Sequence, residues 1–343
     1  MINGCALLDF ESVLICPQKS DLTSRSQVEL NVEYKFKYAT QEWKGIPIIA
    51  ANMDCVGTFE VYERLSQHNM ITALHKFYKP DDYAAFHNNT PLNADLFMVS
   101  IGKSDESIDY LKAVQQVVDF KWICIDIANG YISSYPEYCK TIRYAFPDKI
   151  IVAGNVVTPE AVHDLVINGL VDVVKIGIGP GSACTTRIKT GVGMPQLSAI
   201  IECSRYAAEI GAHIIGDGGI TCPGDLSKAF GGGAHFVMMG GVFSGHDENP
   251  GDIIEKNGLK FKTFYGMSSS KAMKKYYGET AKYRTSEGRE VKVIYKGPIE
   301  NTILDYLGGL RSTCTYVNAK NITELKDKVR FVIVSNQFNS SLL

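Results

Sequence analysis

The chain has 343 residues and a mass of 37.8 kDa, with 45% hydrophobic and 21% charged residues. This length is enough to bury one large core, and the composition excludes a disordered, collagen-like or low-complexity chain. The formal net charge of −2 provides no overall basic field, so we expect neither a nucleic acid nor an acidic membrane surface as a partner.

The cysteines and the first residues bear on the cellular compartment. Nine cysteines, an odd number with no C-x-x-C pair, indicate neither a disulfide framework nor a zinc site. The first fourteen residues lack a cationic region, and Asp9 and Glu11 interrupt their apolar stretch, so no signal peptide is expected. No segment approaches the roughly 18 uncharged apolar residues that a membrane helix needs. We therefore expect a cytoplasmic protein.

Eight short apolar runs recur along the chain, each continuous rather than alternating. They are Pro47–Ala51, Met70–Leu74, Leu96–Ile101, Trp122–Ile127, Ile150–Gly154, Val171–Gly177, His213–Gly219 and His235–Gly241. Continuous apolar runs are typical of parallel strands that are buried on both faces. Most of the intervals between them have room for one helix and two short loops, and the longest interval follows the sixth run.

The intervals carry helix signals in the same order. Thr58–Asn69 has an amphipathic body after a threonine, Thr158-Pro159-Glu160 opens a second helix, and Leu197–Ile210 ends at Gly211. Eight β/α units predict a single (β/α)8 TIM barrel over residues 1–343, preceded by an N-terminal segment at 1–45. A doubly wound open sheet is the alternative. In a barrel, the chemistry belongs on the loops after the carboxyl ends of the strands.

The segment 256–296, after the eighth run, has a different composition. It carries eleven Lys and Arg residues against three Asp and Glu residues, with little strand or helix pattern. We interpret it as a polar excursion, either a mobile active-site flap or a solvated surface arm. A final helix is predicted over Ile299–Leu307, and the tail at 335–343 is expected to be disordered.

The loop after the sixth run, Gly177–Arg187, has glycines at three alternate positions and Cys184 within it. Such glycines permit a close approach of main chain to a ligand, but by themselves they are a weak nucleotide signal. A lone cysteine is commonly a small buried hydrophobe. Because Gly, Ser, Thr and Arg surround Cys184, its setting is polar and electropositive, which favours the thiolate. Cys184 is therefore the candidate nucleophile.

Two more glycine-rich turns follow the seventh and eighth runs, at Asp217-Gly218-Gly219 and Gly240-Gly241. Backbone N–H groups at these strand ends suit the phosphate site of a barrel, and Asp217 could accept hydrogen bonds from ribose hydroxyls. Tight turns with an incidental aspartate are the alternative. The seven histidines lack metal-ligand spacing, and the chain has no Walker loop and no G-x-S-x-G elbow.

These motifs resemble a known family. Gly177–Gln196 resembles the active-site loop shared by IMP dehydrogenases and GMP reductases, and the similarity extends to IPIIAANMDCVGT, GDGGI, the Gly240-Gly241 pair and GMSS at 266–269. The resemblance covers nearly the whole chain. Within the family, TTRIKTGVGMPQ and YRTSEGREV resemble the reductase branch. The chain also lacks the inserted CBS pair and the Arg-Tyr dyad of the dehydrogenases.

The resemblance implies NADPH-dependent conversion of GMP to IMP and ammonia. Cys184 would form a covalent thioimidate at C2 of the purine, and Thr186 with Glu287 would supply the proton for the leaving amine. The alternatives are an IMP dehydrogenase without CBS domains, a non-catalytic purine nucleotide-binding protein, and nucleic-acid binding through the Lys-rich segment. The family also implies a homotetramer.

The resemblance assigns binding residues as well. GMP would contact Ser182, Asp217, Gly218, Gly219, Gly240, Gly241, Gly266, Met267, Ser268, Arg284, Ser286 and Gly288. NADPH would contact Ser24, Arg25, Lys76, Asp126, Ala128, Asn129, Ser312, Thr313 and Tyr316, partly across a subunit boundary. A potassium ion would take the backbone carbonyl oxygens of Gly179, Gly181 and Cys184.

Overall fold

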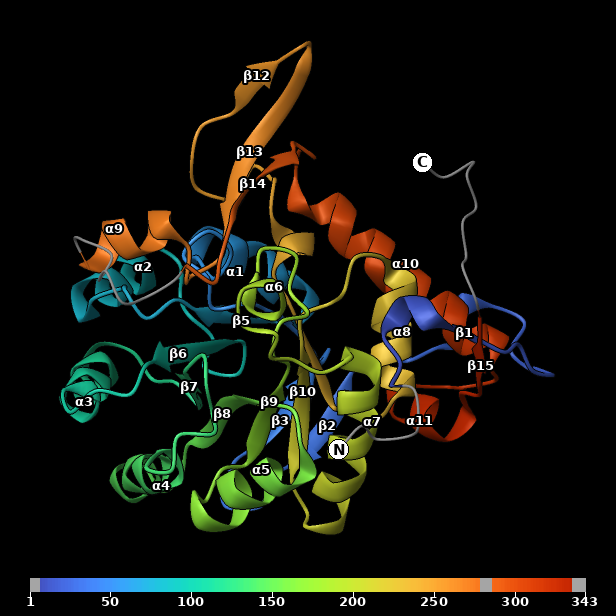
Figure 1. Ribbon diagram of the computed structural model, residues 1–343, viewed down its shortest axis with the longest axis horizontal. Helices are drawn as coiled ribbons and strands as arrows, with labels where there is room; N and C mark the ends of the chain where they lie inside the picture. The colour runs from blue at the N-terminus through green and yellow to red at the C-terminus, as the bar shows by residue number, and fades with distance from the viewer. Residues whose placement is uncertain (1–6, 278–285, 335–343) are drawn as a thin grey trace.

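The computed structural model describes residues 7–277 and 286–334, and its centre is a closed barrel of eight parallel strands (Figure 1). The strands are β4 (Ile48–Ala50), β5 (Ile71–Leu74), β6 (Phe97–Ile101), β7 (Trp122–Asp126), β8 (Ile150–Val156), β9 (Val173–Ile176), β10 (His213–Asp217) and β11 (Phe236–Met239). β11 pairs with β4 and closes the ring. Each predicted apolar run falls on one of these strands, and β8 continues two residues past the end of its run, to Val156. The barrel is therefore confirmed, and the open sheet is wrong.

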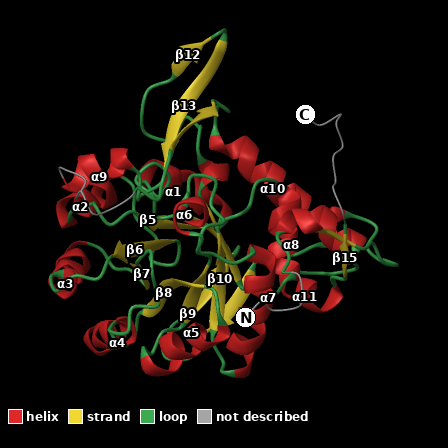
Figure 2. Cartoon of the chain, viewed as in Figure 1, coloured by secondary structure: helices red, strands yellow, loops and turns green. Residues whose placement is uncertain are grey.

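Helices surround the strands (Figure 2). They are α1 (Phe59–Leu65), α2 (Pro80–Asn89), α3 (Ser107–Val117), α4 (Tyr135–Ala145), α5 (Pro159–His163), α7 (Gln196–Glu209) and α8 (Pro223–Gly231), with the short α6 (Thr186–Thr190) in the loop after β9. Thr58 and Thr158 cap α1 and α5 by accepting hydrogen bonds from the third backbone N–H beyond them, as their positions predict. A π-helical turn, Asp164–Asn168, continues α5.

The N-terminal segment closes the amino end of the barrel with a hairpin of β2 (Val32–Lys35) and β3 (Glu42–Gly45). The ring of Tyr34 lies 4.8 Å from that of His213 and 5.1 Å from that of Phe236, the first residues of β10 and β11. Trp43 packs edge-on against Trp122 at the start of β7. This aromatic layer covers the amino end of the barrel, opposite to the end where the strands β4 to β11 finish.

The aromatic layer predicts a pH-dependent stability. Burial lowers the pKa of His213 to about 4 and that of His235 well below its usual value. Below about pH 6.5 the unfolded chain binds these protons and the folded chain does not, so stability falls as the pH falls. We expect the free energy of unfolding to be unchanged above pH 7. Between pH 6.5 and 4 it should drop by up to about 3 kcal/mol for His213.

Urea denaturation at a series of pH values measures this effect. His213→Phe should lower the pH slope by about one proton, because the unfolded state then has one fewer histidine to protonate. Tyr34→Phe is the matched control, since it alters the same layer without changing a group that titrates in this range. An unchanged pH slope in His213→Phe would contradict the assignment.

The segment after β11 contains regular structure, unlike the expected excursion with little pattern. β12 (Ile254–Lys256), β13 (Leu259–Tyr265) and β14 (Glu290–Ile294) form an antiparallel sheet, and α9 (Ser270–Tyr277) follows β13. We call residues 254–296 the arm, and Figure 1 shows its sheet projecting from the barrel in orange. Polar and apolar residues alternate over 290–293 in β14 but only over 259–262 in β13. The mobility of this segment stays a prediction.

The C-terminal part of the chain packs on the barrel. α10 (Ile299–Tyr316) begins where the final helix is predicted but runs past Leu307, and α11 (Leu325–Lys328) follows it. β15 (Phe331–Ile333) pairs antiparallel with β1 (Val13–Ile15). Short 3₁₀ turns lie at Phe10–Ser12, Arg25–Gln27, Ser66–His68, Gly241–Phe243 and Ile322–Glu324. The predicted disordered tail lies outside the described residues. No described helix is both long and apolar enough to cross a membrane.

Candidate active site

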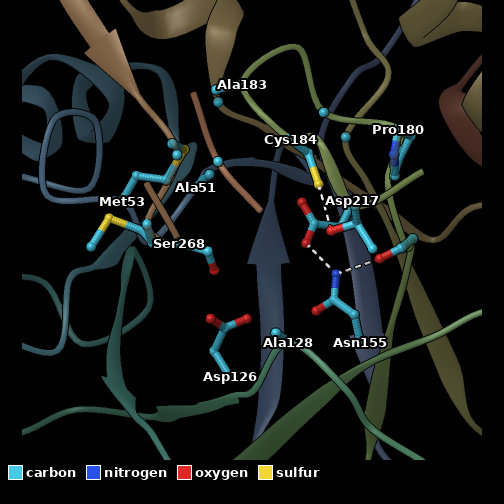
Figure 3. Close-up of a pocket in the computed structure, with 18 of the residues that line it drawn as sticks. Ala51, Met53, Asp126, Ala128, Asn155, Pro180, Ala183, Cys184, Asp217 and Ser268 are labelled. Atoms are coloured by element: carbon cyan, nitrogen blue, oxygen red, sulfur yellow. Dashed lines mark hydrogen bonds between the residues drawn. The ribbon is translucent and has the colours of Figure 1, made fainter. Parts of the chain in front are cut away.

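A cavity of about 560 Å³ opens at the carboxyl end of the barrel, where the sequence places the chemistry. The three glycine-rich segments after β9, β10 and β11 meet in it, together with the loops after β4, β5 and β7 and part of the arm. Figure 3 shows Cys184 and Asp217 on one side of this cavity and Ser268 on the other. Segments distant in sequence therefore form one site.

Cys184, Thr186 and Glu287 form a chain of hydrogen bonds in the cavity. The Cys184 thiol donates to Oγ1 of Thr186 at 3.2 Å, and Thr186 Oγ1 donates to Oε2 of Glu287 at 2.8 Å. All three residues line the cavity. This arrangement provides a path for a proton between the sulfur and the carboxylate, with the sulfur facing the space where a ligand would lie.

Main-chain contacts hold Glu287 in this position. The amide of Thr185 donates to the Glu287 carbonyl at 2.8 Å, and the amide of Arg289 donates to the Ala183 carbonyl at 2.9 Å. Cys184 and Gly288 thereby form an antiparallel bridge between the nucleophile loop and the arm. Because these contacts use backbone atoms, they do not depend on the glutamate side chain.

The contacts of Arg187 correct the expectation that its positive charge acts on Cys184. Its guanidinium lies 3.1 Å from the Asp9 carboxylate and also donates to the Met194 carbonyl. Asp9 belongs to the N-terminal segment, which the loop sequence alone could not place here. The positive charge predicted beside Cys184 is therefore paired with Asp9. The hydrogen-bond partner of the sulfur is the Thr186 hydroxyl.

The other described cysteines fit a structural role. Burial raises the pKa to about 12 for the thiols of Cys55, Cys124, Cys139, Cys203 and Cys314. Such groups stay protonated and inert. Cys222 is exposed and Cys16 partly exposed, and neither lines the cavity. Cys184 is the cysteine that lines it.

Two glycines explain how closely the loops approach one another. Gly177 has a φ of +151°, and a Cβ there would lie 2.2 Å from the Asp217 carbonyl oxygen. A Cβ on Gly241 would lie 2.6 Å from the hydroxyl oxygen of Ser182. Glycine is therefore required at 177, where the neighbour is main chain and φ is positive, whereas a side chain at 241 would displace the Ser182 hydroxyl. The close approach leaves main chain lining the cavity, which suits an anionic group such as a phosphate.

An ion-pair network around the buried Lys175 lines the cavity, and the sequence analysis did not identify two of its members, Lys175 and Asn155. Nζ of Lys175 lies 2.5 Å from Oδ1 of Asp126 and 3.3 Å from Oδ2 of Asp217. The Asn155 amide donates to the same oxygen of Asp217 at 2.8 Å (Figure 3). Burial would lower the pKa of Lys175, but attraction to both carboxylates outweighs burial and raises it. The signal in the sequence that could have identified Lys175 is that a charged residue stands inside the otherwise apolar run Val171–Gly177.

Most predicted substrate contacts lie together. Ser182, Asp217, Gly218, Gly219, Gly240, Gly241, Gly266, Met267, Ser268 and Gly288 line the cavity. Ser286 stands behind its wall, where its hydroxyl contacts the carbonyl oxygens of Ser268 at 3.1 Å and Gly288 at 2.9 Å. Arg284 lies outside the described residues.

The predicted cofactor contacts divide into two groups. Lys76, Asp126 and Ala128 line the cavity beyond Cys184, joined there by Lys103, which the sequence did not single out. Asn129 does not line it and accepts a hydrogen bond from the Tyr131 amide. A second group lies away from the cavity, where the turn Arg25–Gln27 packs on α10; it comprises Ser24, Arg25, Ser312, Thr313 and Tyr316.

The three predicted potassium ligands lie at the cavity. Among the described residues, no group of three or more His, Cys, Asp and Glu side chains could hold a metal ion. Gly179, Gly181 and Cys184 all line the cavity, and the Gly181 carbonyl accepts the Cys184 amide at 3.0 Å. Carbonyl oxygens suit a hard monovalent cation, so potassium binding stays a prediction.

Comparison with known proteins identifies the family. Residues 7–340 match the IMP dehydrogenase / GMP reductase domain. The chain is 52% identical to GMP reductase 1 of Mus musculus over 340 residues, which is 99% of this chain and 98% of the relative. It is 53% identical to the GMP reductase of Photobacterium profundum over 335 residues, 97% and 96% of the two chains. The GMP reductase of Phytophthora infestans is 50% identical over 333 residues, 97% and 92%.

Proposed function

The chain belongs to the IMP dehydrogenase / GMP reductase family, and we propose that it catalyses the NADPH-dependent reductive deamination of GMP to IMP and ammonia. The observation that carries this proposal is the hydrogen-bonded chain of Cys184, Thr186 and Glu287 in the main cavity. The names of the relatives support GMP as the substrate. A protein that only bound a nucleotide would need neither the nucleophile nor its proton path.

The first half of the reaction exchanges the amine of GMP for sulfur. Cys184 gives up its proton along Thr186 toward Glu287, and the thiolate forms a bond to C2 of the purine. The resulting tetrahedral adduct expels the amine, which takes the proton back from the same path and leaves as ammonia. The products are ammonia and a thioimidate on Cys184. The proton lost by the thiol is the one gained by the amine, so this half-reaction balances.

The second half replaces sulfur by hydrogen at C2. NADPH, when bound, supplies the hydride for this replacement, and the Cys184 thiolate is released and protonated again. The cavity fits the nicotinamide end of such a cofactor, because it extends beyond Cys184 to Lys76, Lys103 and Asp126. The Asp126 side chain is 35% exposed while Lys175 holds one of its oxygens, which leaves acceptor capacity for ribose or carboxamide groups.

The remaining residues would orient the substrate. Backbone around Gly219, Gly240 and Gly241 would hold the phosphate, and Asp217 would accept hydrogen bonds from the ribose hydroxyls. Lys175 and Asn155 hold the Asp217 carboxylate in place for this purpose. Met267 and Ser268 would face the base from the arm side.

Three further assignments belong to the same proposal. The carbonyl groups of Gly179, Gly181 and Cys184 would hold a potassium ion that stabilises the nucleophile loop. The group around Arg25 and Tyr316 would meet the adenosine end of NADPH in a homotetramer, since Tyr316 is 63% exposed and away from the cavity of its own subunit. A cytoplasmic location accords with the reducing conditions that a free nucleophilic thiol needs.

The direct test mixes the purified protein with GMP and NADPH and follows the near-ultraviolet absorbance of NADPH. We expect its loss to match the formation of IMP and ammonia, identified by chromatography and an ammonia assay. Formation of NADH from IMP and NAD⁺, without GMP turnover, would instead make the protein a dehydrogenase. GMP binding without either reaction would make it a nucleotide-binding protein.

A further inference from the structure

Asp54 lies outside the catalytic chain and does not line the cavity, yet it joins the barrel to the arm. It belongs to the loop between β4 and α1, and its side chain is buried, with 3% of the residue exposed. One oxygen, Oδ2, accepts three hydrogen bonds from the arm. The donors are the Tyr265 hydroxyl at 2.7 Å, Lys275 Nζ at 2.8 Å and the Tyr276 hydroxyl at 2.6 Å.

The charge of Asp54 makes this attachment strong. Burial would raise the pKa of the Asp54 carboxyl, but the hydrogen bonds from Lys275, Tyr276 and Tyr265 outweigh burial and lower it. The group therefore stays ionised at neutral pH, and hydrogen bonds to an ionised group are roughly twice as strong as neutral ones. Its other oxygen, Oδ1, is buried without a partner in the described part of the chain, so the arm alone supplies its donors.

A second contact clamps the same helix. The ring of Phe77 stacks on that of Tyr276 with centroids 3.4 Å apart and an interplanar angle of 5°. Phe77 directly follows Lys76, which lines the cavity. The loops after β4 and β5 thus both hold α9, one through hydrogen bonds to the Asp54 carboxylate and one through stacking on Tyr276.

The attachment continues to the reactive residues through the backbone of the arm. Tyr265 pairs with Glu290 in the ladder between β13 and β14, and the Gly266 amide donates to the Arg289 carbonyl at 3.2 Å. Ser269 forms a bridge with Gly288. Fixing Tyr265 therefore restrains the segment just before β14, which brings Glu287 to Thr186.

We propose that Asp54 is a positioning residue for the deamination step: it holds the arm so that the Glu287 carboxylate meets the Thr186 hydroxyl. This inference rests on the proposed function, because it assigns Asp54 to the step that needs Glu287. The Asp54 side chain touches neither the cavity nor the reacting atoms. Its backbone amide lies 3.4 Å from Sδ of Met267, which lines the cavity, and substitution of the side chain keeps that amide. Loss of the Asp54 carboxylate would therefore slow deamination by changing the orientation of the arm.

The first experiment measures ammonia release in a single turnover by Asp54→Asn and by Lys275→Met. Asparagine keeps the shape of Asp54, and Lys275 is half-exposed, so neither change threatens the barrel. We expect release to slow by about tenfold to a hundredfold in Asp54→Asn, the effect of losing a charged hydrogen bond, and by less in Lys275→Met. GMP affinity should change by less than about threefold, because no substrate contact is removed.

A double variant that carries both Asp54→Asn and Glu287→Gln distinguishes an effect through Glu287 from a general loss of structure. If Asp54 acts through Glu287, the double variant should be little slower than Glu287→Gln alone. Asp247→Asn is the matched control: this acid accepts a hydrogen bond from Tyr295 of the arm at 2.5 Å, away from the strand end that carries Glu287. It should leave ammonia release unchanged. Multiplicative losses, or a wild-type rate in Asp54→Asn, would overturn the proposal.

Limited proteolysis supplies a readout that does not depend on the reaction. Trypsin should cut the arm at Lys271 and Lys274 several-fold faster in Asp54→Asn than in the wild type or in Asp247→Asn, because α9 is then released more often. Equal cleavage would contradict the attachment even if the protein reduced GMP. Faster cleavage in a protein without GMP turnover would instead reject the proposed function and leave the attachment standing.

Discussion

Replacing Cys184 by alanine is expected to abolish GMP turnover while leaving GMP bound. The sulfur is the atom that bonds to C2, and no other described cysteine lines the cavity to replace it. We expect the rate to fall by at least about ten-thousandfold, the scale seen when a covalent nucleophile is removed. Calorimetry should give a GMP dissociation constant within a few-fold of the wild type, because the phosphate and ribose contacts come from other residues.

Two controls make the result specific. Cys222→Ala removes an exposed cysteine at the start of α8 and should keep full activity. Mass spectrometry of the wild type, quenched during turnover, should detect a purine nucleotide attached to the peptide that contains Cys184. Residual turnover above about one-tenth in Cys184→Ala would reject covalent catalysis by this residue.

Replacing Glu287 by glutamine is expected to slow ammonia release far more than hydride transfer. Glutamine preserves the shape of the side chain and the backbone contact with Thr185, but it cannot take or return the proton of the Cys184–Thr186 path. General acid–base catalysis contributes about a hundredfold to ten-thousandfold, so we expect a loss of that size in deamination. Single-turnover measurement of ammonia reports this step.

Hydride transfer can be measured separately in the opposite direction. IMP and NADP⁺ without ammonia should give NADPH and the thioimidate, and Glu287→Gln should perform this half-reaction within about tenfold of the wild type. Glu290→Gln is the matched control, since that acid pairs with Lys271 in the arm and does not reach the thiol. A variant that lost hydride transfer but kept deamination would show that Glu287 does not carry the proton.

The barrel strands could be predicted from sequence because the information is local. A parallel strand buried on both faces is a continuous apolar run, and every such run named here falls on one barrel strand. The helix starts at Thr58 and Thr158 could also be predicted from sequence, since an N-cap hydrogen bond involves only residues three positions apart. The closing pair, β11 with β4, follows from the regular β/α repeat rather than from any one residue.

The arm shows where local information ends. Leu259–Tyr265 and Glu290–Ile294 alternate polar and apolar residues only in part, and 24 residues separate them along the chain. Their pairing closes a long loop, and no turn signal joins the two strands. Their strand character depends on this contact, so composition suggested an excursion without regular structure.

Within the site, the sequence determined which chemistry was available, and the tertiary structure decided what each residue contacts. Short motifs contain Cys184, the loop glycines and the paired glycines after the last two strands. The glycines can be recognised in the sequence because a close approach of two backbone segments requires glycine at that position. Three contacts are long-range: the pairing of Arg187 with Asp9, the place of Lys175 between two carboxylates, and the hold of Asp54 on the arm. Each joins segments from different parts of the chain. The long-range partners of Lys175 and Asp54 outweigh burial and keep both groups charged. Only the folded chain brings these charges together, so only the structure assigns their partners.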